Sequence, residues 1–173
     1  MTSSISVYID TNCINAKQAN KYLNELEELY IREEILIEKT DTLDTELQDG
    51  KGYPQGLKKS MKYIESYGPT VFDHSRWNSS ILGDEKDEER LSKVLEILWG
   101  KKVRSSYRKQ DIRDAMHIST AIRYGGKYFV TDERKLLNKA DKIEIVFGIK
   151  IRNPENCLDE VKARLKVLEE LEQ

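Results

Sequence analysis

Five acidic residues occupy positions from which a folded chain could bring carboxylates together. Asp10 follows the strand-forming run VYI, and Asp132 follows the run KYFVT, with Glu133 next to it. If both runs are strands of one parallel sheet, their carboxyl ends share the edge where ligands gather. Glu46 and Asp114 lie on predicted helices that follow strands or cross over the sheet. We therefore expect these acids to converge on one place.

Carboxylates that converge need a compensating cation. Like charges repel one another and resist ionising together. Mg²⁺ and Mn²⁺ remove this conflict because both ions prefer oxygen ligands and retain water molecules. One or two such ions can activate a water molecule and stabilise the leaving oxygen of a phosphodiester. The acid pattern therefore suggests metal-dependent phosphodiester cleavage.

Each acid also has a simpler structural explanation. Glu46 could be an ordinary glutamate on a helix surface, whereas Asp114 and Asp132 could cap helices. Asp111 precedes Asp114 by nearly one helical turn, and we interpret it as a helix-start charge favoured by the helix dipole. The combination of acids, in this order along an α/β pattern, is more specific than any single member.

Length and composition place the chain among single-domain globular proteins. It has 173 residues, 38% of them hydrophobic, and 35% charged with a net charge of −2. This nearly neutral net charge argues against binding polyanions through bulk charge, although it does not exclude local basic patches. Two cysteines outside any CxxC pattern and two histidines argue against a structural zinc site. The N-terminal residues show no signal peptide and no stretch suits a bilayer span, so we expect a cytoplasmic protein without membrane contact.

Segments of strand and helix character alternate along the chain. Strands are predicted over residues 5–10, 35–40, 127–131 and 143–148, with a short strand or irregular connection at 70–77. Helices are predicted over 17–34, 40–50, 57–68, 84–99, 111–124, 132–140 and from 153 onward. This alternation predicts one α/β domain, a three-layer sandwich around a mostly parallel sheet, with a helical elaboration around residues 50–100.

A basic segment leads into the helix that carries Asp114. It contains no acid between residues 101 and 110, and Trp99 and Tyr107 flank or interrupt it. Basic and aromatic side chains together can bind phosphates and stack on unpaired bases, although a solvated loop has the same composition. The candidate RNA-binding residues are Lys101, Lys102, Arg104, Arg108 and Lys109.

Two other residues lie close to the acids in sequence. His117 follows Asp114 by three residues and could assist proton transfer, but a structural histidine on a helix is the simpler interpretation. Cys13 is most simply a small buried side chain.

Several blocks of the sequence resemble the PIN-domain family of metal-dependent ribonucleases. VYIDTNCI resembles the opening strand with its acid, and TDTLDTEL resembles the helix that supplies a glutamate. DAMHISTAIRYGGKYFVTDERKLL resembles the long signature of the family, which runs from an acid through a helix, glycines and a strand to a second acid. NPENCLDEV resembles the closing segment, so the resemblance spans nearly the whole chain.

The resemblance implies a Rossmann-like sheet, an acidic pocket for Mg²⁺ or Mn²⁺, and cleavage of single-stranded RNA. By position it assigns the metal-binding acids as Asp10, Glu46, Asp114 and either Asp132 or Glu133. Asn12 and Thr131 would be polar neighbours that orient an acid or a water molecule near the substrate. The similarity extends to toxins of toxin–antitoxin pairs, which would imply an antitoxin or other protein partner, and small folds of this type often form homodimers.

Two other functions remain open from the sequence. The same fold could be a non-catalytic module that binds RNA or protein and keeps a vestigial acidic pocket. It could also be a phosphatase-like enzyme or a DNA-directed nuclease that uses the same ions.

Overall fold

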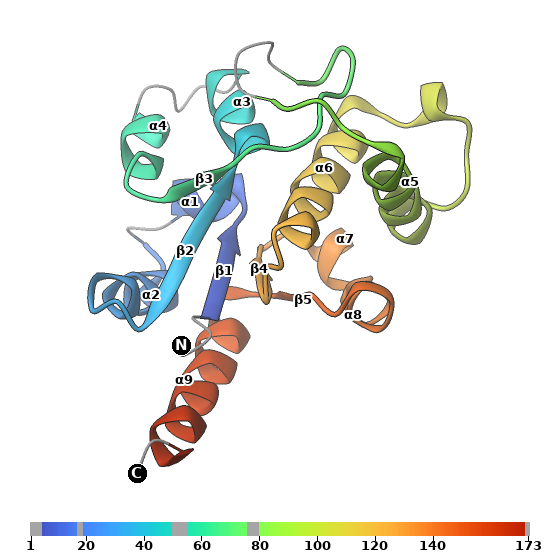
Figure 1. Cartoon of the computed structure of the whole chain (residues 1–173). Coiled ribbons are helices and arrows are strands. Elements are labelled where there is room, and N and C mark those ends of the chain that lie inside the picture. The colour runs from blue at the N-terminus through green and yellow to red at the C-terminus, as the bar shows by residue number, and fades with distance from the viewer. Residues whose placement is uncertain (1–4, 17–18, 50–54, 76–79, 172–173) are drawn as a thin grey trace.

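The computed structural model describes residues 5–16, 19–49, 55–75 and 80–171. At its centre lies a parallel sheet whose strands follow the order β3-β2-β1-β4-β5 (Figure 1). The strands are β1 (Ile5–Ile9), β2 (Ile35–Thr40), β3 (Ile64–Ser66), β4 (Tyr128–Val130) and β5 (Lys150–Arg152).

Helices follow most of the strands along the described chain. Those before residue 100 are α1 (Thr11–Ala16), α2 (Lys21–Ile31), α3 (Asp41–Asp49), α4 (Gln55–Ser60) and α5 (Glu85–Trp99). After a short 3₁₀ helix η1 (Arg104–Ser106) come α6 (Lys109–Arg123), α7 (Arg134–Leu137), α8 (Ala140–Phe147) and α9 (Pro154–Leu171).

Alternating strand residues build the two cores on either side of the sheet. Val7 and Ile9 of β1 pack in the core that includes α2 and α9, whereas Tyr8 packs in the core that includes α5, α6 and α8. Successive side chains of a strand point to opposite faces, so this central strand is buried on both. Figure 1 shows the helices on both sides of the sheet. The predicted three-layer α/β fold with a parallel sheet is confirmed.

The strand order creates a switch point at the centre of the sheet. β1 pairs with β2 on one side and with β4 on the other. The chain therefore builds the sheet outward from β1 through β2 first, and later adds β4 on the other side of β1. Ligands of open α/β sheets bind beyond the carboxyl ends of the strands at such a point. Asp10 and Thr131 directly follow β1 and β4 there.

The predicted strand over residues 143–148 is wrong, because residues 143–147 form the end of α8 and Gly148 caps it. Ala140 and Ile143 are buried and Phe147 packs against the same core, whereas Ile145 is 84% exposed. Buried positions three and four residues apart fit a helix, not a strand. Gly148 ends α8 in the left-handed conformation (φ 76°), and β5 follows it.

The predicted helix over residues 57–68 is wrong from residue 61 onward. Helix α4 ends at Ser60, and β3 pairs with β2 so that Ile64 lies opposite Glu38. Residues 50–100, predicted as a helical elaboration, thus also supply an edge strand. Residues 70–75 form no strand, and Pro69 makes an isolated bridge with Ile81; residues 76–77 lie outside the described part of the chain.

The helix predicted over 17–34 is shorter in the described part of the chain, and residues 17–18 lie outside that part. α2 begins at Lys21, where the Asn20 side chain accepts hydrogen bonds from the backbone N–H groups of Tyr22 and Leu23. The separate helix α1 directly follows Asp10. Conversely, α6 begins two residues earlier than the predicted start at Asp111.

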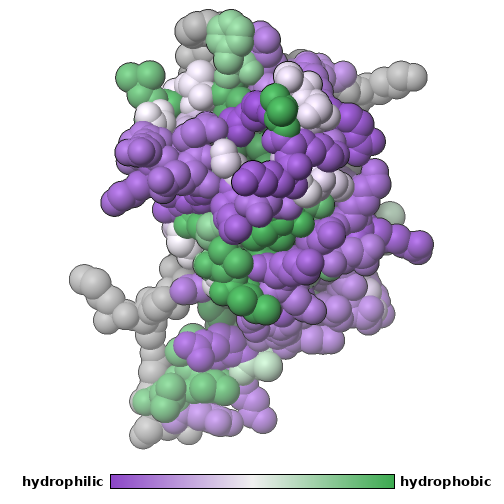
Figure 2. Space-filling view, turned by 90° about the vertical axis from the view of Figure 1, so that its right-hand side faces the viewer, coloured by the Kyte–Doolittle hydropathy of each residue, from purple (hydrophilic) through white to green (hydrophobic). Residues whose placement is uncertain are grey.

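The outer surface of the α5 side is mostly polar. Figure 2 shows hydrophilic side chains over most of this face, with a band of hydrophobic side chains crossing its middle. Among the described residues, no helix combines the length and apolar character that crossing a bilayer requires.

Candidate active site

Asp10 is fixed at the switch point by hydrogen bonds from both neighbouring segments. Its side chain is buried, and Oδ1 accepts a hydrogen bond from the Thr11 backbone N–H at 2.7 Å. Oδ2 accepts a hydrogen bond from the Thr131 hydroxyl at 2.6 Å. The carboxylate at the end of β1 is therefore held in one orientation by residues at the ends of two adjacent strands.

Helices α3 and α6 bring the next two acids to the same place. Glu46 Oε2 accepts a hydrogen bond from the Thr11 hydroxyl at 2.5 Å. The Gln110 amide donates to Glu46 Oε1 at 2.9 Å and to Asp114 Oδ1 at 2.7 Å. Gln110 thus links the two carboxylates, and Asp10, Glu46 and Asp114 all line one cavity of about 510 Å³.

His117 lies underneath these acids and is 1% exposed. Its Nε2 is 3.2 Å from Glu46 Oε2, and its Nδ1 shares a hydrogen bond of 2.6 Å with the Thr40 hydroxyl. Ligand atoms of Asp10, Glu46 and His117 all lie within 4.8 Å of one another. Burial and two hydrogen bonds agree with the structural interpretation of His117, and the contact with Glu46 also joins it to the acids. Its spacing of three residues from Asp114 is the sequence signal that places both on one helix face.

Burial and mutual repulsion perturb the acids. Burial raises the pKa of Asp10, and it raises the pKa of Asp114 to about 7 with contributions from the charges of Asp10 and Glu46. Burial also opposes ionisation of Glu46, but the charge of His117 and hydrogen bonds outweigh it and lower the pKa of Glu46 to about 2. The same pairing overcomes the burial of His117 and raises its pKa to about 9.

The donor set fits a divalent cation. Three carboxylates and one imidazolium carry a net charge of −2 when all are ionised, and this excess adds to burial in raising the pKa of Asp114. A hard divalent ion with oxygen ligands would remove it. Asp10, Glu46 and Asp114 are placed to hold such an ion, with His117 fixing Glu46 from behind.

Of the two acids that follow Thr131, Glu133 faces the site. Glu133 lines the cavity and is half-buried, whereas Asp132 is exposed and does not line it. The Asp132 backbone N–H donates to Asn12 Oδ1 at 3.4 Å. This placement favours Glu133 over Asp132 as the fourth acid.

Asn12 and Thr131 lie beside Asp10. The Asn12 amide donates to the Thr131 hydroxyl oxygen at 3.2 Å, and that hydroxyl in turn donates to Asp10. Cys13 is buried next to them, as predicted. The contacts give Thr131 a role in orienting Asp10, and contact of either polar residue with substrate remains a prediction.

The basic segment is divided between two places. Arg108 lines the acidic cavity while its guanidinium binds Asp111, and Lys109 Nζ lies 3.5 Å from Asp49. The helix-start position of Asp111 is confirmed, because its carboxylate also accepts the Arg108 backbone N–H. The remaining candidates line a separate hollow beside α5 and are not brought to the acids; they are Lys101, Lys102 and Arg104.

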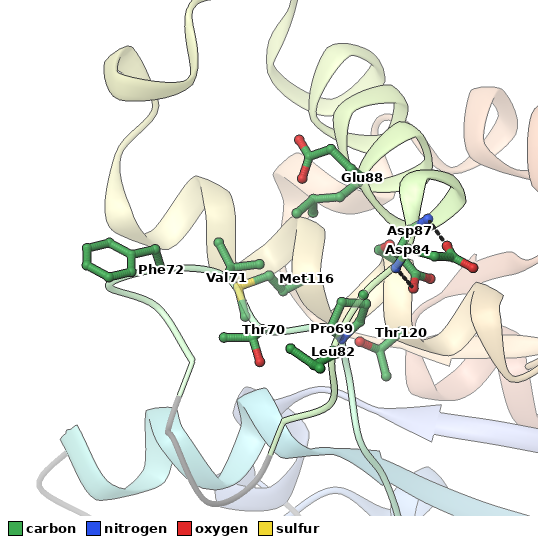
Figure 3. Close-up of a pocket in the computed structure, with 13 residues that line it drawn as sticks. Pro69, Thr70, Val71, Phe72, Leu82, Asp84, Asp87, Glu88, Met116 and Thr120 are labelled. Atoms are coloured by element: carbon green, nitrogen blue, oxygen red, sulfur yellow. Dashed lines mark hydrogen bonds between the residues drawn. The ribbon is translucent and has the colours of Figure 1, made fainter.

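A second cavity of about 380 Å³ lies between α5, α6 and the segment around Pro69 (Figure 3). Its acids are already engaged: Asp84 caps α5, and Asp87 binds Arg90 and Arg123. Figure 3 shows Met116 and Val71 close together in this cavity, and Phe72 directed away from it. This cavity lacks converging groups for hydrolysis, so the acidic cavity is the candidate active site.

Sequence reasoning passed over Gln110 and Arg113 of α6 and Asp49 at the end of α3, which all line the acidic cavity. Their sequence signal is proximity to Asp114 or Glu46, but spacing alone does not show which neighbours face inward. Lys135, a further basic candidate beside Glu133, also lines the cavity.

The sequence matches no family model and no curated protein. Among solved structures, the chain is similar to the crystal structure of VapBC2 from Rickettsia felis bound to a DNA fragment from their promoter. The sequence identity is 14%, the TM-score is 0.49, and the comparison covers 86% of this chain and 98% of that chain. With a similarity this distant, functional conclusions depend on the residues of the site itself.

Proposed function

We propose that this chain is a PIN-like endoribonuclease that uses Mg²⁺ or Mn²⁺ to hydrolyse phosphodiester bonds in single-stranded RNA. One observation carries the proposal: the carboxylates of Asp10, Glu46 and Asp114 converge at the switch point of a parallel sheet. They come from the end of β1, from α3 and from α6, which are separated by more than thirty residues along the chain. The PIN-like sequence blocks surround these same residues.

The proposed metal ligands are Asp10, Glu46, Asp114 and Glu133, with Asp132 as the alternative fourth acid. A divalent ion bound there supplies Lewis acidity and charge neutralisation for phosphodiester hydrolysis. Thr11 and Thr131 hold the carboxylate of Asp10, and His117 holds that of Glu46. The chain thereby orients its oxygen donors before the substrate arrives.

The partners follow from the resemblance, and the location is the expectation from the sequence. The proposal includes RNA as the substrate, an antitoxin or other protein as a regulatory partner, a homodimer as the assembly, and the cytoplasm as the location. Each of these can be tested separately from the chemistry.

A non-catalytic binding module is the second candidate, and one observation favours it. Glu46 and Asp114 are already satisfied by Gln110, and Glu46 is paired with His117. Carboxylates with such partners can be stable without a metal. In this case the acidic cavity would be vestigial, and RNA or protein binding would be independent of metal.

The test is cleavage of a mixed-sequence single-stranded RNA by the purified chain in Mg²⁺, in Mn²⁺ and in EDTA. Matched DNA of the same sequence tests whether the activity is confined to RNA. We expect metal-dependent cleavage that Asp10→Asn abolishes. Asp159→Asn on the exposed surface of α9 is the control that should retain it. A folded Asp10→Asn protein that cleaves normally contradicts the proposal.

A further inference from the structure

Arg113 is a charged residue that is nearly buried in the wall of the acidic cavity. It immediately precedes Asp114 on α6, and only 7% of its surface is exposed. Both residues line the cavity, so the wall that carries a proposed metal ligand also carries a cation. A guanidinium is costly to bury unless its donors find acceptors.

The hydrogen bonds of Arg113 are incomplete. Its Nη2 donates to Asp49 Oδ2 at 2.5 Å. Its Nε is shielded from solvent and has no hydrogen-bond partner among the described residues. A buried N–H without an acceptor is unfavourable and points to a second acceptor that is supplied from outside the chain.

Asp49 is a replaceable partner for Arg113. Its side chain is 51% exposed at the edge of the cavity, and Lys109 lies near the same carboxylate oxygen. Asp49 is also the last residue of α3, where the helix dipole disfavours a negative charge. Its carboxylate is therefore held there chiefly by the two cations, and it can turn to solvent when another anion takes its place.

Cations lie in and beside the acidic cavity. Arg113 and Lys109 stand near Asp49, whereas Arg108 and Lys135 line the cavity elsewhere. The charge of the first pair is felt beyond the cavity: burial lowers the pKa of His74, and Arg113 and Lys109 lower it further. A chain of phosphates that crosses the acid centre would need cations for the phosphates next to the one being cleaved.

We propose that Arg113 is a binding site for a backbone phosphate of the RNA, next to the phosphodiester that is cleaved, and that Asp49 occupies this site when no RNA is bound. This inference rests on the proposed function. The planar guanidinium can donate from Nε and one terminal nitrogen to two phosphate oxygens, which would satisfy the donor that is now without a partner. Asp49 thus competes with the RNA for Arg113.

The two partners of this ion pair should have opposite effects on RNA binding. We would measure fluorescence anisotropy of a labelled octauridylate in EDTA and in Ca²⁺. Arg113→Gln should weaken binding about tenfold, and Arg113→Lys should recover part of the loss. Asp49→Asn should strengthen binding about threefold, because it frees Arg113 for phosphate.

The salt dependence of binding is a second readout. Loss of one phosphate contact should reduce the slope of log affinity against log salt by about 0.7 for Arg113→Gln. The exposed pair Lys162–Glu25 joins α9 and α2 away from the cavity, and Lys162→Gln and Glu25→Gln are the matched controls. Neither control should change the affinity for RNA. The controls therefore distinguish the effect of losing any surface charge from the effect of losing the Arg113 site.

Three results overturn the inference: unchanged affinity in Arg113→Gln, weaker binding in Asp49→Asn, or no binding of the oligonucleotide by the wild-type chain. If Arg113 only joined α3 to α6, both variants would lower the melting temperature and neither would alter affinity. The proposed function fails separately. If RNA binds through Arg113 but is never cleaved, the nuclease proposal fails and the phosphate-binding site stands. If RNA is cleaved equally well by Arg113→Gln, the phosphate-binding site fails and the nuclease proposal stands.

Discussion

His117 Nε2 lies 3.2 Å from Glu46 Oε2 in the interior of the protein, with the Thr40 hydroxyl on the other ring nitrogen. The ring is therefore held at both nitrogens and presents a fixed donor to the carboxylate. This contact joins α6 to α3 and sets the direction from which Glu46 meets Asp10. A group that orients a metal ligand in this way affects metal affinity without touching the substrate.

We expect His117→Gln to lower the affinity for Mn²⁺ about tenfold, because Glu46 loses its buried cationic donor. Isothermal titration calorimetry measures this directly. His74→Gln is the control, since the other histidine does not line the acidic cavity. Equal affinities in the wild type and in a folded His117→Gln protein would mean that Glu46 does not depend on His117.

The stability of the metal-free protein should fall as the pH rises from 5 to 8. The pKa of Asp114 is raised to about 7, so its stabilising contribution is complete below the unfolded value near 4 and is lost as pH passes 7. His117, with its pKa raised to about 9, begins to lose its contribution above its ordinary value of 6.5. Glu46, with a pKa near 2, is ionised throughout this range.

Melting temperatures at pH 5 and pH 8, with and without Mn²⁺, test this prediction. Metal must displace the proton of Asp114 at low pH, so the increase in melting temperature caused by Mn²⁺ should be larger at pH 8. An increase that is the same at both pH values would show that the raised pKa of Asp114 is irrelevant to metal binding.

Glu133 and Asp132 can be distinguished by substitution. Glu133→Gln should lower Mn²⁺ affinity and RNA cleavage about tenfold or more, because Glu133 faces the cavity. Asp132→Asn removes an exposed carboxylate and should leave both within about twofold of wild type. Parallel titrations and cleavage assays of the two variants check this, and a larger effect at Asp132 would reverse the assignment.

Thr131→Val should preserve the fold and weaken the site. The substitution keeps the shape but removes the hydroxyl that donates to Asp10 at 2.6 Å, so ionised Asp10 loses a buried donor and its pKa rises further. The pH at which Mn²⁺ binding is half-maximal should therefore move upward. Thr45→Val is the matched control, because that buried hydroxyl donates only to the Asp41 carbonyl. Identical pH profiles for the two variants would contradict the role of Thr131.

The architecture was largely readable from local patterns. The run VYI followed by Asp10, and the run KYFVT followed by an acid, place two strand ends correctly because buried parallel strands are short and apolar. The helix carrying Asp114 was likewise evident from its apolar spacing and the glycines after it. Three of the acids that these elements carry lie in one cavity.

Other elements depended on partners far away in the sequence. Residues 64–66 form a strand because they pair with β2. Residues 143–147 form a helix because only one side of that apolar run packs against the core. A short apolar segment is compatible with either structure, and tertiary contacts decide between them.

The residue types at the site were determined by the sequence, but their relationships were decided by the tertiary structure. The sequence by itself supplied the acids, and their order along an α/β chain pointed to a metal-dependent reaction. Only the folded chain placed His117 against Glu46, turned Glu133 inward beside the exposed Asp132, and put Arg113 next to Asp49. The physical reason is that spacing along a helix or strand fixes which face a side chain occupies. What that face meets depends on how separate elements pack over the same edge of the sheet.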